Sequence, residues 1–202
     1  MRVRANSAQA QLSLPETGFN TAMERVAREE LRHKFMPARV GLLFVGESPP
    51  AGGTFFYAAD SGLFRATRDA FCDAIEGCER FDSFLDCFMA LGCYLEDLCH
   101  EPVNHLIGSA DGSKSKRLEA RRAGESHLAR TIAQLQPLVI IVLLKAIEEN
   151  VERAAAAAGF AQTERYVLTY PSRWHRHRLA YRRELAALLR DMPAQRRITF
   201  IA

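Results

Sequence analysis

Three short segments of the sequence combine residues that can do chemistry, and each follows an apolar run. The first is the turn Gly46-Glu-Ser-Pro-Pro50, the second ends in Asp97, and the third is Tyr170-Pro-Ser-Arg-Trp-His-Arg-His-Arg178. Carboxylates and hydroxyls can accept hydrogen bonds, orient water or move protons. A tryptophan flanked by cations suits base stacking and phosphate contacts. These residue types favour an aromatic, anionic ligand such as a nucleic acid.

Alternating strand and helix patterns predict how these segments are positioned. Strands are predicted at 39–45, 93–99, 138–144 and 166–170, and helices at 15–34, after Gly62, at 118–135, at 146–159 and after residue 178. The first and third strands are apolar without period-2 alternation, which is typical of strands covered on both faces. The order predicts one domain over residues 1–202, a three-layer α/β/α sandwich around a central, mainly parallel four-stranded sheet. Residues 1–14 are predicted to be a flexible tail, and 197–201 could add an edge strand.

The carboxyl ends of parallel strands share one edge of a sheet, where open α/β folds bind their ligands. The three segments should therefore converge on a single cleft. Between the second and third segments lies the most polar part of the chain, residues 107–125. We expect it to form a mobile basic loop that leads into the next helix.

Composition and cysteine content indicate in which cellular compartment the protein is expected. The net charge is +3, hydrophobic residues make up 48% of the chain, and no apolar run approaches the ~20 residues of a membrane helix. The N-terminus lacks an apolar signal-peptide core, so we expect a cytoplasmic protein. Five cysteines lie between residues 72 and 99 without a CxxC pair. They predict buried thiols in a reducing compartment, with a metal or iron–sulfur site as the alternative.

Taken in order, the motifs resemble those of the uracil-DNA glycosylase superfamily. Gly46-Glu-Ser-Pro49 is similar to the turn that opens the family's site, and Ala51-Gly-Gly-Thr-Phe-Phe56 resembles the mismatch-specific branch. Leu95-Glu-Asp-Leu98 followed by Pro102 is similar to the second landmark, and Tyr170-Pro-Ser172 to the third. The resemblance covers residues 39–190. It implies a uracil-DNA glycosylase-like fold and a DNA repair glycosylase that flips out and hydrolytically excises uracil, leaving an abasic site.

The resemblance also implies roles in holding uracil. Gly46 lies in the uracil-binding turn, and Phe55 or Phe56 stacks on the base, with Phe55 favoured and the other ring in the core. Asp97 lies where the family reads the pyrimidine edge, usually with Asn. An ionised Asp accepts from uracil N3–H but repels O4 unless it is protonated. The alternative for Asp97 is a solvated carboxylate at a strand end.

Catalytic roles follow in the same way. Ser48 occupies the position of the family's water-activating Asp or Asn, and a neutral hydroxyl is a poor base. Glu47 is the first substitute, with a carboxylate that pairs with turn N–H groups as the alternative. Tyr170 replaces the His that stabilises the leaving oxyanion, and an uncharged phenol should stabilise it less.

Two basic regions are expected to contact DNA. In the third segment these are Ser172, Arg173, Trp174, His175 and Arg176, where Ser172 would hold a phosphate and Trp174 would enter the gap left by the flipped base. A core tryptophan is the alternative. In the basic loop, Lys114, Lys116 and Arg117 would clamp the DNA after base flipping. The alternative is a disordered surface loop that has no role in DNA binding.

The sequence thus predicts a monomeric enzyme that acts on uracil-containing or abasic DNA, single- or double-stranded. Neither a metal, nor another cofactor, nor a membrane is expected to take part. One alternative is a low-turnover DNA-binding member of the superfamily that recognises uracil or abasic sites. Another is a binder of free nucleobases or nucleotides, which would not need so wide a basic rim.

Overall fold

Four parallel strands form the centre of the molecule. The computed structural model describes residues 17–103 and 113–192, so the predictions for residues 1–14 and 197–201 fall outside it. The strands are β1 (Leu42–Gly46), β2 (Cys93–Asp97), β3 (Val139–Val142) and β4 (Glu164–Val167), in the order β2-β1-β3-β4. Every neighbouring pair is parallel. The predicted α/β class with a four-stranded parallel sheet is confirmed.

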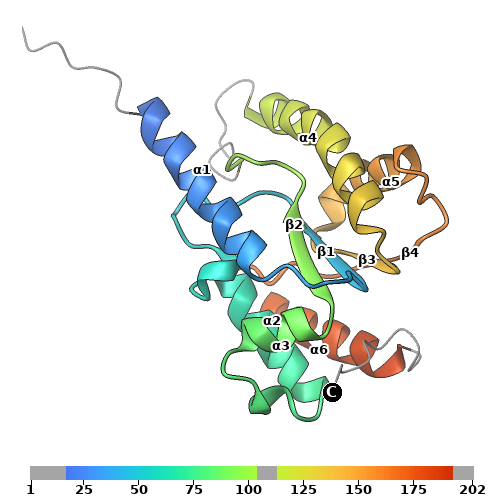
Figure 1. The fold of residues 1–202 in the computed structure, drawn as a ribbon. Coiled ribbons are helices and arrows are strands. Elements are labelled where there is room, and N and C mark those ends of the chain that lie inside the picture. The colour runs from blue at the N-terminus through green and yellow to red at the C-terminus, as the bar shows by residue number, and fades with distance from the viewer. Residues whose placement is uncertain (1–16, 104–112, 193–202) are drawn as a thin grey trace, which may run out of the picture.

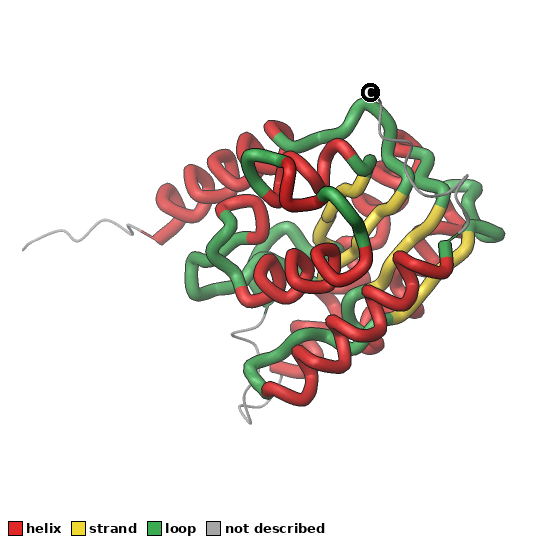
Figure 2. Tube along the Cα trace, turned by 90° about the horizontal axis from the view of Figure 1, so that it is seen from below, coloured by secondary structure: helices red, strands yellow, loops and turns green. Residues whose placement is uncertain are grey.

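Six helices within the described residues flank this sheet. They are α1 (Thr17–Lys34), α2 (Gly62–Ala74), α3 (Phe84–Ala90), α4 (Ser113–Leu135), α5 (Glu148–Ala157) and α6 (His175–Asp191). Short 3₁₀ turns occur at Phe56–Ala58, Cys78–Arg80 and Lys145–Ile147. Helices α4 and α5 lie on one side of the sheet, and α2, α3 and α6 on the other (Figure 1). The view from below shows the strands enclosed between these helices (Figure 2).

Strands β1 and β3 are the apolar centre of the core. All residues of both strands are buried, and Leu43, Phe44, Ile140 and Ile141 have no exposed surface. Because successive side chains point to opposite faces, a strand buried at every position must be covered on both faces. The Phe44 ring packs against Phe71 of α2 and Phe88 of α3. This packing explains why the two runs lack alternation.

Strand β2 lies at an edge of the sheet, and Tyr57 covers part of that edge. Its hydroxyl accepts a hydrogen bond from Leu95 N (2.7 Å) and donates one to Leu95 O (3.1 Å). An edge strand otherwise leaves such groups without partners. The segment that follows β1 is thereby fixed against the strand that ends in Asp97.

Several predicted boundaries were wrong, and the largest error is in the basic segment. Helix α4 begins at Ser113, five residues before the predicted helix start at residue 118, so residues 113–117 are helical instead of belonging to a mobile loop, while 107–112 lie outside the described residues. Lys, Arg, Glu and Ala favour helix. Strand β4 ends at Val167, three residues before Tyr170, and α6 already begins at His175. In the described part of the chain, no helix has the length and apolar character needed to cross a membrane.

Helix α4 packs closely against the segment after β2 at Gly124. A Cβ on this glycine would lie 2.0 Å from the carbonyl oxygen of Leu98, which belongs to the backbone and cannot yield. We therefore expect Gly124→Ala to lower the free energy of unfolding by about 1–3 kcal/mol, despite the better helix propensity of Ala. Urea denaturation measures this loss. Gly52→Ala is the matched control, because nothing lies within 4 Å of its added Cβ; equal stability of the two variants would contradict the close contact.

Candidate functional site

A cleft of about 620 Å³ opens at the carboxyl edge of the sheet. It is lined by all three segments that the sequence singled out: Gly46, Glu47 and Ser48 after β1, Asp97 at the end of β2, and Tyr170, Ser172 and Arg173 after β4. Phe55 and Phe56 form part of the wall, and Arg117 of α4 also reaches it. The volume is within the range of roughly 300–1,000 Å³ that is typical of small-ligand pockets.

Glu47 is held by two arginines of α4. Arg117 binds both of its carboxylate oxygens, through Nε (2.7 Å, to Oε1) and Nη2, and Arg121 donates from Nε (2.7 Å, to Oε1). The alternative in which Glu47 pairs with turn N–H groups is therefore wrong. Burial favours a higher pKa for Glu47, but the hydrogen bonds from the two guanidinium groups outweigh it and lower this pKa. Glu47 is an ionised carboxylate whose oxygens are already occupied.

The Ser48 hydroxyl is engaged by the backbone. It accepts a hydrogen bond from Val103 N and donates one to Pro49 O, both at 3.2 Å. These contacts tie the segment after β2 to the Gly46–Pro50 turn. Ser48 lines the cleft, but most of its hydrogen-bonding capacity is used in shaping it.

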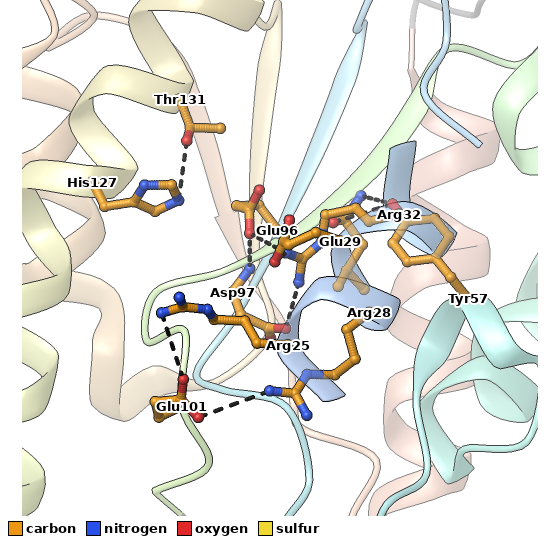
Figure 3. Close-up of polar contacts among 11 residues, drawn as sticks. Arg25, Arg28, Glu29, Arg32, Tyr57, Glu96, Asp97, Glu101, His127 and Thr131 are labelled. Atoms are coloured by element: carbon orange, nitrogen blue, oxygen red, sulfur yellow. Dashed lines mark hydrogen bonds and ion pairs between the residues drawn. The ribbon is translucent and has the colours of Figure 1, made fainter. Parts of the chain in front are cut away.

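Asp97 is buried, so the alternative of a solvated strand-end carboxylate is wrong. It belongs to a cluster around Arg32, a residue of α1 with 2% exposure that the sequence analysis missed. Arg32 Nη2 donates to Asp97 Oδ2 at 3.0 Å, while Nη1 lies 3.0 Å from Glu96 Oε1 and 2.6 Å from Glu29 Oε1. Figure 3 shows the guanidinium group between the three carboxylates.

One guanidinium group cannot neutralise three carboxylates. Burial raises the pKa of Glu96 to about 7 and that of Asp97 to about 6, against the opposing effect of Arg32. Arg28 lies nearby but pairs with the exposed Glu24 and Glu101. Glu96 and Asp97 therefore take up protons in the range from pH 5 to 7.

The two adjacent phenylalanines have different surroundings. Phe56 packs its ring against Phe64 and Phe88 in the core. Phe55, also buried, lies under the Arg32 guanidinium, whose Cζ is 5.5 Å from the ring centroid. The backbone N–H of Phe55 is fixed by Asp60 Oδ1 at 2.7 Å. Both rings line the cleft and both are buried, so the choice of Phe55 as the stacking ring stays a prediction.

After β4, the chain presents Tyr170 and Ser172 to the cleft. Desolvation raises the pKa of Tyr170, and the charges of Asp97 and Glu47 add to this effect, so its hydroxyl stays protonated and can donate. Ser172 Oγ lies 2.7 Å from His177 Nδ1. His177 therefore positions Ser172, a role that sequence reasoning did not assign.

Trp174 stands at the rim, immediately before α6. Its side chain is 55% exposed, which excludes the core alternative, and Arg173 lies over its ring at 5.1 Å from Cζ to centroid. His175 and Arg176 begin α6 and are exposed. Lys114 and Lys116 are exposed on the first turn of α4, and of the three basic residues predicted there only Arg117 lines the cleft. The two basic residues in the described lining of the cleft are therefore Arg117 of α4 and Arg173, just before α6.

A metal centre is not evident in the part of the chain that the structure describes. No group of three or more His, Cys, Asp or Glu side chains there could hold an ion. The five cysteines are free thiols, four of them buried.

Two signals could have found the missed residues. Glu96 and Asp97 are adjacent acids inside an apolar strand, and such a pair requires a buried cation. Arg117 and Arg121 are one helical turn apart, as needed to bind a single carboxylate.

No family model matches the chain, and no curated protein matches its sequence.

The acidic cluster predicts an unusual pH dependence of stability. With pKa values raised to about 7 and 6, Glu96 and Asp97 hold more protons in the folded than in the unfolded protein between about pH 4 and 7. The contribution of these two groups to the free energy of unfolding should therefore fall as pH rises across this window, by up to about 1.4 kcal/mol per pH unit for each group. Burial lowers the pKa of His100 and His127, so these two groups act in the opposite sense, and the carboxylate contribution is read from the difference between wild type and a Glu96 variant. Urea titrations at pH 5, 6 and 7 test this.

Glu96→Gln should remove much of that slope, because Gln does not titrate. Glu76→Gln, at an exposed position after α2, is the control and should keep it. Equal pH slopes for wild type and Glu96→Gln would contradict the raised pKa of Glu96.

Proposed function

We propose that this protein is a DNA glycosylase that flips out and hydrolytically excises uracil from DNA, leaving an abasic site. The observation that carries the proposal is the single cleft in which the Gly46–Pro50 turn, Phe55, Asp97 and Tyr170–Ser172 meet. The all-parallel sheet in the order β2-β1-β3-β4 supports a uracil-DNA glycosylase-like fold. The proposed substrate is uracil-containing DNA, single- or double-stranded, bound by a monomer.

The cleft residues have separable roles in this reaction. Phe55 stacks on the extruded base, and Asp97 accepts a hydrogen bond from its edge. As the glycosidic bond breaks, its electron pair moves to the base, and the protonated Tyr170 hydroxyl donates to the developing oxyanion. Water then adds to the sugar carbon, and the proton that it loses is taken up by the departed uracil anion, so that neutral uracil and an abasic site result.

DNA is held outside the cleft by the rim. Ser172, positioned by His177, and Arg173 contact phosphates, and exposed Trp174 fills the gap left by the flipped base. Lys114, Lys116 and Arg117 approach the backbone from α4. Phosphate contacts of this kind make binding weaken steeply with salt, whereas binding of a free nucleobase would hardly respond.

The ion pair at Glu47 favours a second candidate function. A general base needs a free oxygen, and Glu47 is gripped by two arginines while Ser48 is bonded to the backbone. A protein with this fold and no water-activating group would bind uracil or abasic sites with little turnover.

A single-turnover assay on uracil-containing oligonucleotides separates the two functions. We expect slow release of uracil by the wild type and a rate about 10-fold or more higher for Asp97→Asn, because an ionised Asp97 repels the anionic leaving base. Glu125→Gln, on the α5 side of α4, is the control. Absence of release by both proteins, together with tight binding of abasic-site DNA in a gel shift, would favour the second function.

The rim predicts how DNA binding responds to salt. Arg173→Gln should weaken binding to all DNA sequences and reduce the slope of log K against log salt by about one. Arg130→Gln, at an exposed position near the other end of α4, should change neither quantity. Electrophoretic or fluorescence titrations at several salt concentrations measure the slope, and identical slopes for the two variants would argue against the assigned rim.

A further inference from the structure

The two carboxylate oxygens of Asp97 face different surroundings. Oδ2 accepts a hydrogen bond from Arg32 Nη2 at 3.0 Å, on the side of α1 (Figure 3). Oδ1 lies beside Gly46, since a Cβ on that glycine would be 2.5 Å from it. Both residues line the cleft, and Oδ1 has no hydrogen-bond partner among the described residues. One oxygen is bound by the protein and the other is left for a ligand.

Arg32 is fixed in this arrangement from several sides. Its Nη1 is held by Glu29 and Glu96, and its Cζ lies over the Phe55 ring. The same guanidinium group therefore orients the carboxylate at the cleft floor and supports the aromatic wall.

We propose that Arg32 is a positioning residue that makes Asp97 a one-oxygen acceptor, so that the cleft selects nucleobases with an unsubstituted imide N–H. This specificity rests on the proposed function of the cleft. In uracil, N3–H lies between two carbonyl groups, and a carboxylate that faced it with both oxygens would repel one of them. With Oδ2 turned to Arg32, only Oδ1 meets the base edge, and the repulsion is reduced.

Charged or titratable groups from four parts of the chain face Asp97. They are Arg28, Glu29 and Arg32 of α1, Glu47 after β1, Glu96 of β2 and the neutral Tyr170 after β4. Burial raises the pKa of Asp97 to about 6, so the carboxylate is mainly ionised at pH 7.5 and protonated at pH 5. A proton on Oδ1 converts the acceptor into a donor, and the preference for N–H should then be lost.

The decisive experiment compares free uracil with 3-methyluracil, which lacks the N–H, by isothermal titration calorimetry at pH 7.5. Wild type should bind uracil about 10- to 100-fold more tightly, as expected for a hydrogen bond to a charged group. Asp97→Ala should bind both bases alike. Equal binding of the two bases by wild type, or no uracil binding at millimolar concentration, would overturn the proposal.

The pH profile tests the role of Arg32. Lowering the pH to 5 should erase the preference in wild type but not in Asp97→Asn, whose amide oxygen accepts at both pH values. Arg32→Gln, with folding checked by circular dichroism, should move the midpoint of this loss upward by about one pH unit or more. Arg25→Gln, an exposed arginine on the same helix, should leave it in place. An unmoved midpoint in folded Arg32→Gln would refute the positioning role.

If Arg32→Gln does not fold, Arg32→Lys replaces it. Lysine keeps the charge but cannot bind Asp97, Glu96 and Glu29 with one planar fork, so the preference for uracil should fall while the midpoint stays. An unchanged preference would overturn the role of Arg32. Loss of uracil release from DNA with an intact base preference would contradict only the glycosylase activity, and normal release with equal base binding would contradict only this inference.

Discussion

The burial of the Arg32 guanidinium group is the constraint on which the functional edge of the sheet depends. Removing a guanidinium group and carboxylates from water costs several kcal/mol per ion, and only close mutual contacts offset that cost. Arg32 makes such contacts with Glu29, Glu96 and Asp97. Its buried Nε, however, has no hydrogen-bond partner among the described residues. The cluster joins α1 to the end of β2, but it leaves unbalanced negative charge at the cleft floor.

Two acidic residues of the cleft consequently have opposite properties. Glu47 meets two guanidinium groups, so its pKa is lowered and its oxygens are occupied. Asp97 shares one guanidinium group with two other carboxylates, so its pKa is raised and one oxygen stays open. Burial raises the pKa of both carboxylates; two guanidinium groups outweigh this effect at Glu47, whereas one shared guanidinium group does not outweigh the stronger desolvation of Asp97. Near neutral pH, Asp97 is the group of the two that can change its protonation state.

The strand–helix alternation and the cleft could be predicted because both follow from local patterns. The central strands β1 and β3 lack polar side chains, and the carboxyl ends of parallel strands meet at one edge, which brought Glu47, Asp97 and Tyr170 together. The partners of these residues could not be predicted in the same way. Arg32 is 65 positions from Asp97, and Arg121 is 74 from Glu47. Such ion pairs depend on how the helices pack on the sheet. The periodicity of hydrophobic residues within one helix or strand carries no information about that packing.

Helix α4 shows how local and long-range effects combine. Its first turns, Ser113–Arg117, are polar enough to suggest a loop, yet Arg117 and Arg121 are spaced so that a helix presents both to Glu47. The helical state is favoured because it satisfies a buried carboxylate. The start of α4, which the sequence pattern placed too late, therefore lies beside Arg117 and Arg121, the pair that binds Glu47.

The cleft is lined by cations and carboxylates together. Arg173 and Arg117 lie in its lining with Glu47 and Asp97, and in the proposed function these arginines would face the phosphate backbone. Asp97 at the floor favours a neutral base with an N–H but opposes negative charge that develops on that base. Binding and bond cleavage therefore make conflicting demands on one carboxylate. If the proposed function holds, such a cleft should recognise its base well and release it slowly, and proton uptake by Asp97 is the physical event that shifts the balance between the two.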